Sequence, residues 1–348
     1  MSGKTTLFSA VVETGGSSVD LSRPDLPHSA MVKVPDDRLE YLAEIYKPRK
    51  KTLAELEIVD VPGLDFSCEA GKNRSRTSWS SMRQCDMLAF VVRSFDDSTV
   101  PAYRNRVDPL ADVTEIRDEM ILADLEQVTT RAEKLEVSVK KPTPDRYNQA
   151  RELEIMKCLR ETLENGNPVS SAIHSPMEEK IIRSFAFLTL KPAVVVLNCD
   201  ENGMTSREQD EMESMPVLRL SAKIEQEIAQ LPAEERKEFL SEMGLKEPAT
   251  RRFVGACHNR AHLISFLTTV ENECRAWCIP SGTTAVNAAE VIHSDIARGF
   301  IRAEVVSYDD LVASDGEMKK ARAAGEVRLE GKDYVVKDGD VINFRFNV

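Results

Sequence analysis

Four short apolar runs most constrain how this chain can fold. Each of them is followed directly by polar residues. They lie at 56–60, 87–92, 194–198 and 217–220, with helical patterns between them. Continuous β-branched runs separated by helices predict a parallel sheet that is buried on both faces. In an open α/β sheet the carboxyl ends of the strands share one edge, where ligands bind. The sequence therefore predicts an α/β fold with its ligand site at that edge.

The N-terminal residues carry a pattern that binds phosphate. Ser2, Gly3, Lys4, Thr5 and Thr6 match the end of a P-loop, whose backbone N–H groups surround phosphates at a helix N-terminus. The lysine then reaches the β- and γ-phosphates, and the first threonine binds Mg²⁺. The first glycine of the motif and the strand before it do not occur in this sequence. An ordinary frayed N-terminus is the alternative interpretation.

An acidic residue ends the first of the four runs. Asp60 and Gly63 form a D-x-x-G pattern. In P-loop NTPases the aspartate reaches Mg²⁺ through water, and the glycine meets the γ-phosphate. A bare turn after a strand is the alternative interpretation.

Two later motifs predict contacts with a nucleotide base. Asn198 and Glu201 follow the third run, where GTPases have N-K-x-D with an aspartate that binds guanine. A glutamate is misplaced for the two guanine N–H donors, so guanine is not favoured. Ser221 and Ala222 follow the fourth run and match the S-A-K element beside the base, although Ser221 could simply be a helix N-cap. All four motifs occur in the order of the GTPase set, so together they predict a nucleotide site.

Two further regions have patterns of their own. Between 111 and 164 apolar residues recur at three- and four-residue spacing, interrupted by Pro142 and Pro144, which predicts an α-helical hairpin. The pattern changes again from about residue 275. Within this region, the residues at 285–293 predict a helix. Asp338-Gly339 between 334–336 and 341–346 predicts a β-hairpin. Strands and a helix in this short stretch predict a small β-grasp-like domain.

Composition limits the partners. The 348 residues include 46 basic and 58 acidic side chains, a net charge of −12, so the chain does not coat DNA or RNA by bulk charge. Its apolar runs fall far short of the roughly 18 residues that span a bilayer, and its polar start is unlike a signal peptide. Seven cysteines without a C-x-x-C pair indicate reduced thiols. We expect a cytoplasmic protein with no membrane or DNA partner.

The chain resembles the YchF family, the Obg-like ATPases, along nearly its whole length. The matching stretches read VPDDRL, VDVPGL, VVRSFDD, KPAVVVLNCDENG, SAKIEQEIAQL, AAEVIHSDIARGFIRAEVVSYDDL and RLEGKDYVVKDGDVINFRFNV. The resemblance implies a Ras-like P-loop NTPase domain at 1–110 and 186–272. It also implies an inserted α-helical coiled-coil arm at 111–185 and a C-terminal β-grasp (TGS) domain at 273–348.

The resemblance also implies an activity and a partner. It implies that ATP is preferred to GTP through N-x-x-E, and that the chain associates with the ribosome through the large subunit or its rRNA. We therefore expect a monomer that slowly hydrolyses ATP with Mg²⁺ and acts as a translation or stress switch. The catalytic residues would be Lys4, Gly63 and Leu64, and the metal ligands Thr5 and Asp60. The nucleotide contacts would be Ser2, Gly3, Lys4, Thr5, Thr6, Asn198, Glu201, Ser221 and Ala222.

In the family the residue after D-x-x-G is hydrophobic and replaces the glutamine that orients the attacking water in Ras-type enzymes; Leu64 is that residue here, so intrinsic hydrolysis should be slow. The sequence also departs from the family, which keeps other hypotheses open. Pro24 falls where the family has the switch threonine that binds Mg²⁺. With the missing first glycine, these residues motivate a second hypothesis, a non-catalytic ribosome- or partner-binding adaptor with a degenerate pocket. A GTPase is the third hypothesis, and Glu201 argues against it.

Overall fold

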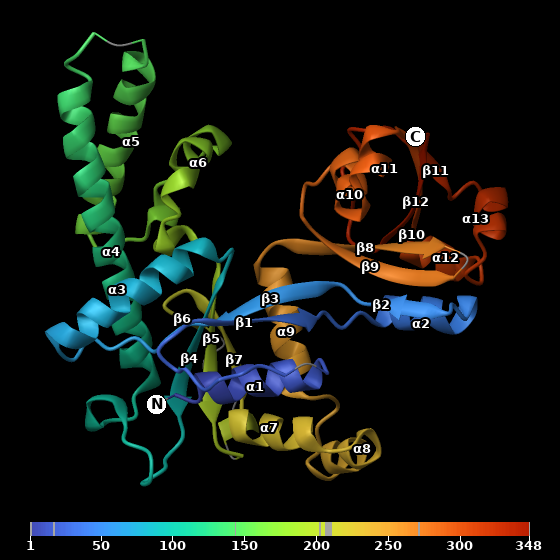
Figure 1. Cartoon of the computed structure of the whole chain (residues 1–348), viewed down its shortest axis with the longest axis horizontal. Coiled ribbons are helices and arrows are strands. Elements are labelled where there is room, and N and C mark those ends of the chain that lie inside the picture. Colours follow the sequence, from blue (N-terminus) through green and yellow to red (C-terminus); the bar gives the residue numbers. More distant parts are fainter. Residues whose placement is uncertain are drawn as a thin grey trace. The chain divides into compact units, whose positions relative to one another are not determined.

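The structure is a computed structural model that describes residues 2–16, 18–142, 144–201, 203–205, 211–270 and 272–347 (Figure 1). The chain forms two compact units, each built from several segments. Unit 1 consists of Met1–Leu7, Asp20–His28 and Asp60–Ile224. Unit 2 consists of Phe8–Val19, Ser29–Val59 and Glu225–Val348. Each unit is described in its own right below.

Unit 1 contains a four-stranded sheet in the order β4-β5-β7-β6. Its strands are β4 (Leu88–Ser94), β5 (Ala193–Cys199), β7 (Met215–Leu220) and β6 (Glu211–Met212). The first three are parallel, and β5 is buried at every residue. Three of the four predicted strands therefore lie in one parallel sheet, as expected, because fully apolar strands are stable where both faces are covered.

The remaining predicted strand lies in a different sheet. Residues 56–60 belong to β3 (Glu55–Asp60), which pairs with β1 (His28–Lys33) in a sheet of two strands. The sequence correctly predicted this strand, but the structure does not pair it with β4, β5 or β7. Strand pairing depends on contacts between distant segments, which a local apolar run does not specify.

Helices flank the strands that carry the predicted motifs. Helix α1 (Lys4–Thr14) begins inside the N-terminal motif and buries Leu7, Phe8 and Val11. Helix α3 (Glu69–Gln84) follows the D-x-x-G segment, and helix α7 (Ala222–Gln230) follows β7. Short 3₁₀ turns occur at η1 (Tyr103–Asn105) and η5 (Gly203–Thr205). Each motif therefore lies between a strand and a helix or directly at a helix start.

An α-helical hairpin projects from the sheet within unit 1 (Figure 1). It is formed by α4 (Pro109–Ser138) and α5 (Arg146–Glu164), and the predicted break at Pro142 falls between them. Their facing sides share an apolar cluster that includes Val128, Leu135 and Met156. The return to β5 contains η2 (Val169–Ser171), α6 (Pro176–Ile182), η3 (Arg183–Phe185) and η4 (Leu188–Leu190). The predicted helical hairpin is thus confirmed.

A buried ion pair fixes the base of this arm. The Asp124 carboxylate is fully buried and lies 2.8 Å from Arg83 Nη1. It accepts hydrogen bonds from the backbone N–H groups of Leu188 and Thr189 at 3.0 and 2.8 Å. These bonds satisfy the charge inside a low-dielectric site, so they hold α4, α3 and η4 in one arrangement.

Unit 2 contains a six-stranded sheet in the order β11-β10-β12-β8-β9-β2. The strands are β11 (Arg328–Glu330), β10 (Phe300–Ser307), β12 (Asp340–Phe346), β8 (Leu263–Val270), β9 (Glu273–Pro280) and β2 (Lys50–Thr52). Helices α10 (Ala285–Ile292) and α11 (Ser294–Arg298) pack against it around Phe266, Val305 and Ile342. Helix α10 confirms the prediction for 285–293.

Two expectations for this region differ from the structure. The predicted hairpin between 334–336 and 341–346 is wrong, because Val335 forms only an isolated bridge with Thr284. Strand β12 pairs instead with β10 and β8. The expected TGS boundary at 273 falls between β8 and β9, which pair along their whole length, so β8 shares the sheet with the residues assigned to that domain. The division into domains stays a prediction.

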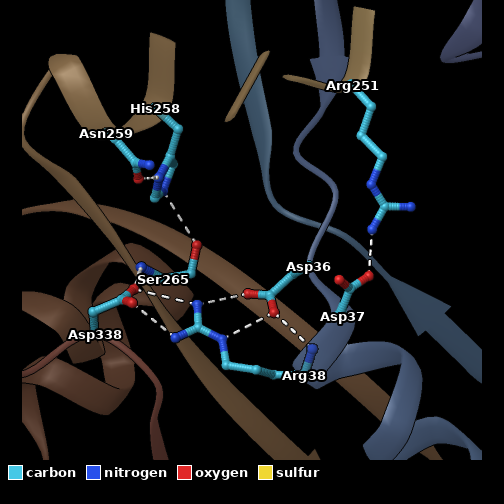
Figure 2. Close-up of polar contacts among 8 residues, drawn as sticks. All are labelled: Asp36, Asp37, Arg38, Arg251, His258, Asn259, Ser265 and Asp338. Carbon is cyan, nitrogen blue, oxygen red and sulfur yellow. Dashed lines mark hydrogen bonds and ion pairs between the residues drawn. The ribbon is translucent and has the colours of Figure 1, made fainter. Parts of the chain in front are cut away.

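A cluster of polar contacts joins the start of α2 (Asp37–Tyr46) to the sheet of unit 2 (Figure 2). Arg38 donates two hydrogen bonds of 2.9 Å to Asp36, the N-cap of α2, and one of 2.8 Å to Asp338. Asp338 also accepts from the backbone N–H of Ser265 in β8 at 2.8 Å. Ser265 Oγ lies 3.3 Å from His258 Nε2. The Arg38 guanidinium thus ties the start of α2 to the loop before β12, and Asp338 in that loop is bonded in turn to β8.

The remaining helices also belong to the described part of unit 2. They are α8 (Ala233–Glu242), α9 (Ala249–Arg260), α12 (Tyr308–Ala313) and α13 (Met318–Ala324). The buried Glu225 carboxylate accepts the backbone N–H groups of Ala249 and Thr250, both at 2.9 Å, which anchors the first turn of α9. Among the described residues, no helix has the length and apolarity needed to cross a bilayer.

Candidate functional site

The N-terminal motif and the D-x-x-G motif meet in unit 1. Lys4 Nζ contacts both the Asp60 carboxylate and the carbonyl oxygen of Val61. Thr5 Oγ1 donates a 2.9 Å hydrogen bond to Asp60 Oδ2. The helix N-terminus of α1 adds backbone N–H groups that point along the helix axis. A cation, a hydroxyl and a carboxylate predicted from separate motifs are therefore in direct contact.

A cavity of about 310 Å³ lies beside these groups. Its walls come from the N-terminal motif, from the segment before β1 and from the D-x-x-G segment. They comprise Ser2, Gly3, Lys4, Thr5, Thr6, Leu21, Pro24, Leu26, His28, Asp60, Val61, Pro62 and Gly63. All of these residues belong to unit 1. The cavity opens onto Lys4 and the start of α1, which suits a negatively charged ligand.

Asn198 links two of the predicted motifs. Its Nδ2 donates to the carbonyl oxygen of Ser2 at 2.8 Å, and its Oδ1 accepts from the backbone N–H of Ala222 at 2.9 Å. The side chain is 5% exposed, so both bonds form away from water. Asn198 thus fixes the N-terminal motif against the S-A-K segment, which explains the amide side chain at the end of β5.

Gly3 is required by this arrangement. Its φ of +84° lies in the region that disfavours side chains, and an added Cβ would lie 2.2 Å from Asn198 Nδ2. The glycine therefore allows the backbone to approach the Asn198 amide.

The other base-motif residues occupy less specific positions. Ser221 is buried directly before α7, and its Oγ accepts from the Ile224 backbone N–H at 3.5 Å, so the N-cap interpretation has a geometric basis. Ala222 is buried, and its N–H bonds to Asn198. Glu201 lies in the turn after β5 and is exposed. The structure bonds Ala222 to Asn198, with Ser221 next to Ala222 in the chain, and leaves Glu201 exposed.

Thr5 and Asp60 provide the donor chemistry that Mg²⁺ requires. Magnesium prefers hard oxygen ligands and usually binds through one or two protein groups plus substrate phosphates and water. Thr5 Oγ1 and the Asp60 carboxylate are such oxygens, 2.9 Å apart. The described residues contain no cluster of three or more acidic, cysteine or histidine side chains that would form a self-sufficient metal cage. The site therefore fits a cation bound jointly with phosphate.

The residues after Asp60 divide between two surroundings. Gly63 lines the cavity, and an added Cβ there would meet no atom within 4 Å. Leu64 packs against an apolar cluster that contains Phe66, Trp79 and Met82. Pro24 lines the cavity wall where the family resemblance places a threonine. Leu64 offers no group that accepts a proton or orients water.

Sequence reasoning did not find His28. The imidazole lines the cavity, and its Nε2 lies 2.8 Å from the carbonyl oxygen of Arg23. No motif surrounds His28 in the sequence. Its place in the wall depends on where β1 begins, which is set by tertiary pairing. Leu21 and Leu26 were missed for the same reason.

Comparisons with known proteins identify relatives of this chain. The family model YchF-GTPase_C, described as a protein of unknown function (DUF933), matches residues 263–347. The "Ribosome-binding ATPase YchF" of Bacillus subtilis (strain 168) is 38% identical, covering 99% of this chain and 96% of the relative. The protein of that name from Pasteurella multocida (strain Pm70) is 37% identical with the same coverage. A solved structure described as the Schizosaccharomyces pombe YchF GTPase has a TM-score of 0.85 at 28% identity.

The structural match extends over the whole fold, since it covers 99% of this chain and 94% of the Schizosaccharomyces pombe chain. It confirms the predicted class, an α/β Ras-like P-loop domain with a helical arm and a C-terminal β-rich domain.

Proposed function

Because the chain belongs to the YchF family, we propose that it binds ATP with Mg²⁺ and hydrolyses it slowly to ADP and phosphate. The observation that carries this proposal is the convergence of Lys4, Thr5 and Asp60 beside the start of α1. These three groups supply the positive charge and the oxygen ligands that a triphosphate with its metal requires. The names of the relatives, which include both ATPase and GTPase, support nucleotide turnover.

Each side chain has a defined task in this proposal. Lys4 would exchange its Asp60 contact for the β- and γ-phosphates, and backbone N–H groups at the start of α1 would bind the remaining phosphate oxygens. Thr5 Oγ1 would hold Mg²⁺ directly and Asp60 through water. Bound Mg²⁺ would neutralise charge on the phosphate oxygens. Gly63 leaves room for a γ-phosphate because no atom lies within 4 Å of the Cβ it lacks.

Base selection would depend on the segment after β5. Asn198 would fix the N-terminal motif and the S-A-K segment, and Ser221 and Ala222 would line the base with backbone atoms. Glu201 is exposed and free to turn toward a base. A longer carboxylate at this position is unsuited to the two guanine donors, which favours ATP over GTP.

Slow turnover follows from the residues around the γ-phosphate position. Leu64 packs among apolar side chains and orients no water. Without a positioned acceptor, hydrolysis loses the roughly 10²–10⁴-fold that general base catalysis supplies. Lys4 and Mg²⁺ would still stabilise charge in the transition state, so a low rate remains.

A second function is favoured by a specific observation. Lys4 is engaged by Asp60 and Val61, and Pro24 lines the cavity where a hydroxyl would be needed. An adaptor that retains the scaffold and has lost turnover fits these contacts. Such a protein would bind its partner equally well with and without nucleotide.

The proposed partner in both cases is the ribosome, through its large subunit or rRNA. The names of the bacterial relatives support this, and a ribosome partner would place the protein in the cytoplasm. We also propose that it acts as a monomer. Co-sedimentation with separated ribosomal subunits, with ATP, ADP or no nucleotide, tests it. Binding to the small subunit alone, or to neither subunit, would contradict the proposal.

Nucleotide titration separates the enzyme from the adaptor. We expect micromolar ATP binding with Mg²⁺, much weaker GTP binding, and at least a tenfold loss of ATP affinity in Lys4→Ala, because a charge-assisted contact contributes about 1.5–3 kcal/mol. Lys237→Ala, on the exposed side of α8, is the matched control and should bind as the parent chain does. If a folded parent chain binds neither nucleotide, the adaptor hypothesis replaces the enzyme.

A further inference from the structure

The helical arm of unit 1 has an uneven distribution of charge. Its end that lies away from the sheet, here called the arm tip, comprises 138–142 and 144–151 (Figure 1). The arm tip contains one acidic side chain, Asp145, and four basic ones, which are Lys140, Lys141, Arg146 and Arg151. The rest of the two helices is acidic, since 109–137 holds three basic and eight acidic residues, and 152–164 holds two and four. An acidic arm therefore ends in a basic tip.

The basic side chains of the arm tip also differ from the others in their bonding. Along the arm, Arg131 Nε lies 2.7 Å from the Glu152 carboxylate, and Lys157 Nζ lies 3.4 Å from that of Glu136. The basic side chains of the arm tip form no ion pair or side-chain hydrogen bond with any residue that the structure describes. Their charge is therefore available to an outside ligand.

Tyr147 lies among these unpaired cations and is 80% exposed. The exposed tyrosines of α2 differ from it, because Tyr41 packs edge-on against Tyr308 and the Tyr46 hydroxyl donates to the Gly316 carbonyl oxygen. Tyr147 has no ring contact or hydrogen bond with a described residue. A single exposed aromatic side chain is ordinary on a protein surface. A bare ring among four unpaired cations is not, and together they form a surface suited to a ligand with flat rings and negative charge.

The arm tip is held in a fixed shape by bonds between the two helices. Ser138 Oγ donates to Gln149 Oε1 at 2.9 Å. Further down the arm, Arg131 donates two hydrogen bonds to Glu152, at 2.7 and 2.8 Å. Leu135 is 2% exposed in the apolar cluster between the helices. Because the helices support Tyr147 and its neighbours, a ligand would bind there with little loss of backbone entropy.

We propose that the arm tip binds an unpaired loop of RNA. Tyr147 stacks on one base of the loop, and the four basic side chains bind the phosphates beside it. An aromatic ring combined with Lys and Arg is the usual way in which proteins bind unpaired nucleic acid. The bases of duplex RNA are stacked on one another, so only a loop, bulge or end offers a base to the ring. The proposal rests on the proposed ribosome partner only for the source of the RNA.

The surroundings of the arm tip favour RNA over a protein partner. A protein interface needs a continuous apolar core, whereas Tyr147 and Val137 are the large apolar side chains exposed at this end of the described arm. An acidic protein segment would pair with the cations but leave the ring without a contact. The acidic residues further along both helices repel phosphates, which restricts RNA to the arm tip.

Fluorescence anisotropy on the full chain tests the proposal with two labelled RNAs. One is a hairpin with a loop of about eight uridines, and the other is a duplex with the same number of phosphates. We expect the hairpin to bind at least about fivefold more tightly than the duplex. Its affinity should fall with salt at a logarithmic slope of about −3, because each phosphate contact on a single strand contributes about −0.7.

Variants of Tyr147 separate stacking from charge. Tyr147→Ala should weaken hairpin binding at least about fivefold and leave duplex binding unchanged, because the loss of one stacked base is confined to the loop. Tyr147→Phe retains the ring and should bind the hairpin as the parent chain does. The side chain is exposed, so neither substitution disturbs the fold.

A change of charge at the arm tip should act on both RNAs. Replacing Lys140 and Lys141 together by alanine should weaken hairpin and duplex alike and reduce the salt slope on the hairpin by about 1.4. Lys180→Ala is the matched control, because Lys180 is an exposed lysine on α6, outside the arm tip. It should leave both affinities and the slope unchanged.

Several outcomes would overturn the proposal. Equal binding of hairpin and duplex, or unchanged hairpin binding in Tyr147→Ala, would show that the ring stacks on no base. Unchanged binding after loss of Lys140 and Lys141 would place the RNA elsewhere on the chain. A peptide of about ten glutamates that binds as tightly as the hairpin, with no loss in Tyr147→Ala, would identify an acidic protein segment as the ligand.

Co-sedimentation distinguishes this proposal from that of the ribosome partner. If Tyr147→Ala still sediments with ribosomal subunits as the parent chain does, the arm tip is not the contact and the ribosome partner stands. If the parent chain binds the hairpin through Tyr147 but sediments with neither subunit, the arm tip binds RNA and the ribosome is the wrong partner.

Discussion

Strands β4 and β12 have the same length and different neighbours. Each has seven residues, most of them apolar. Strand β12 lies between β10 and β8 in unit 2, whereas β4 forms one end of the sheet in unit 1. The comparison teaches that apolar content identifies a strand but not its place in a sheet. Among the described residues, β12 is paired with a strand on both sides and β4 is paired with β5 alone.

The largest expected effect comes from placing proline in each strand. Ile342→Pro should destabilise unit 2 by about 3 kcal/mol or more, because Ile342 is 2% exposed and proline removes a ladder hydrogen bond. Val91→Pro should cost about 1 kcal/mol, since its N–H lies outside the β4–β5 ladder. Opening free energies from hydrogen exchange of the amides in each sheet measure the two costs separately.

The comparison would break if the two prolines cost the same. A large loss in Val91→Pro would show that the side of β4 opposite β5 is bonded as well. Val91→Ala and Ile342→Ala serve as controls, because they remove side chain without changing the backbone donor. The difference between proline and alanine at each position isolates the hydrogen bond.

The failed hairpin shows why pairing is hard to predict from sequence. Asp338-Gly339 is a good turn signal, and β12 was predicted correctly. However, Asp338 accepts the Ser265 N–H, and the Gly339 N–H donates to the Ser265 carbonyl oxygen. The turn is thus bonded to β8, about 70 residues earlier in the chain, and 334–336 is left without a strand partner. Local patterns give strand positions, whereas such distant contacts decide which strands meet.

The candidate site was predictable to the extent that short motifs encode it. Lys4, Thr5 and Asp60 were identified from motif order, and the structure places them in contact. Asn198 was assigned to the base, yet its bonds reach the N-terminal motif as well. His28 lines the cavity without any local signal. The sequence identifies side chains that belong to short motifs. It does not identify side chains that only strand pairing brings to the site.

A second prediction concerns the contact on which the phosphate site depends. Gly3→Ala forces a Cβ to within 2.2 Å of Asn198 Nδ2 and also places a side chain at positive φ. The lost Asn198–Ser2 bond and the strain should together weaken ATP binding by about tenfold or more. Nucleotide titration measures this, and exchange of the Ala222 amide reports the Asn198 bond directly.

Gly16→Ala is the matched control for this change. Gly16 also has positive φ, at +78°, but an added Cβ there meets no atom within 4 Å. The control therefore carries the backbone strain without the collision. If both variants lost the same affinity, strain alone would explain the effect, and Asn198 would not be needed to hold the motif.

The smallest expected effect is acid sensitivity in unit 2, where the polar cluster of Figure 2 should respond to pH. Burial raises the pKa of the Asp338 carboxyl, but hydrogen bonds from Arg38 and Ser265 more than offset this and bring it below its ordinary value of 3.8. A depressed pKa stabilises the folded state above the unfolded pKa, so this contribution is present above about pH 4 and is lost as the pH falls further.

Asp338→Asn should therefore lower the stability of unit 2 at pH 6 by no more than about 1 kcal/mol, because the carboxylate is half exposed and partly screened. The difference from the parent chain should shrink below pH 4, where the parent's own carboxylate becomes protonated. Asp333→Asn, at an exposed position in the same loop, should show neither effect. Denaturant unfolding from pH 2.5 to 6 measures all three proteins. A stability difference that stayed constant with pH would mean that Asp338 acts through the shape of the turn and not through its charge. The ion pair with Arg38 would then contribute nothing to the stability of unit 2.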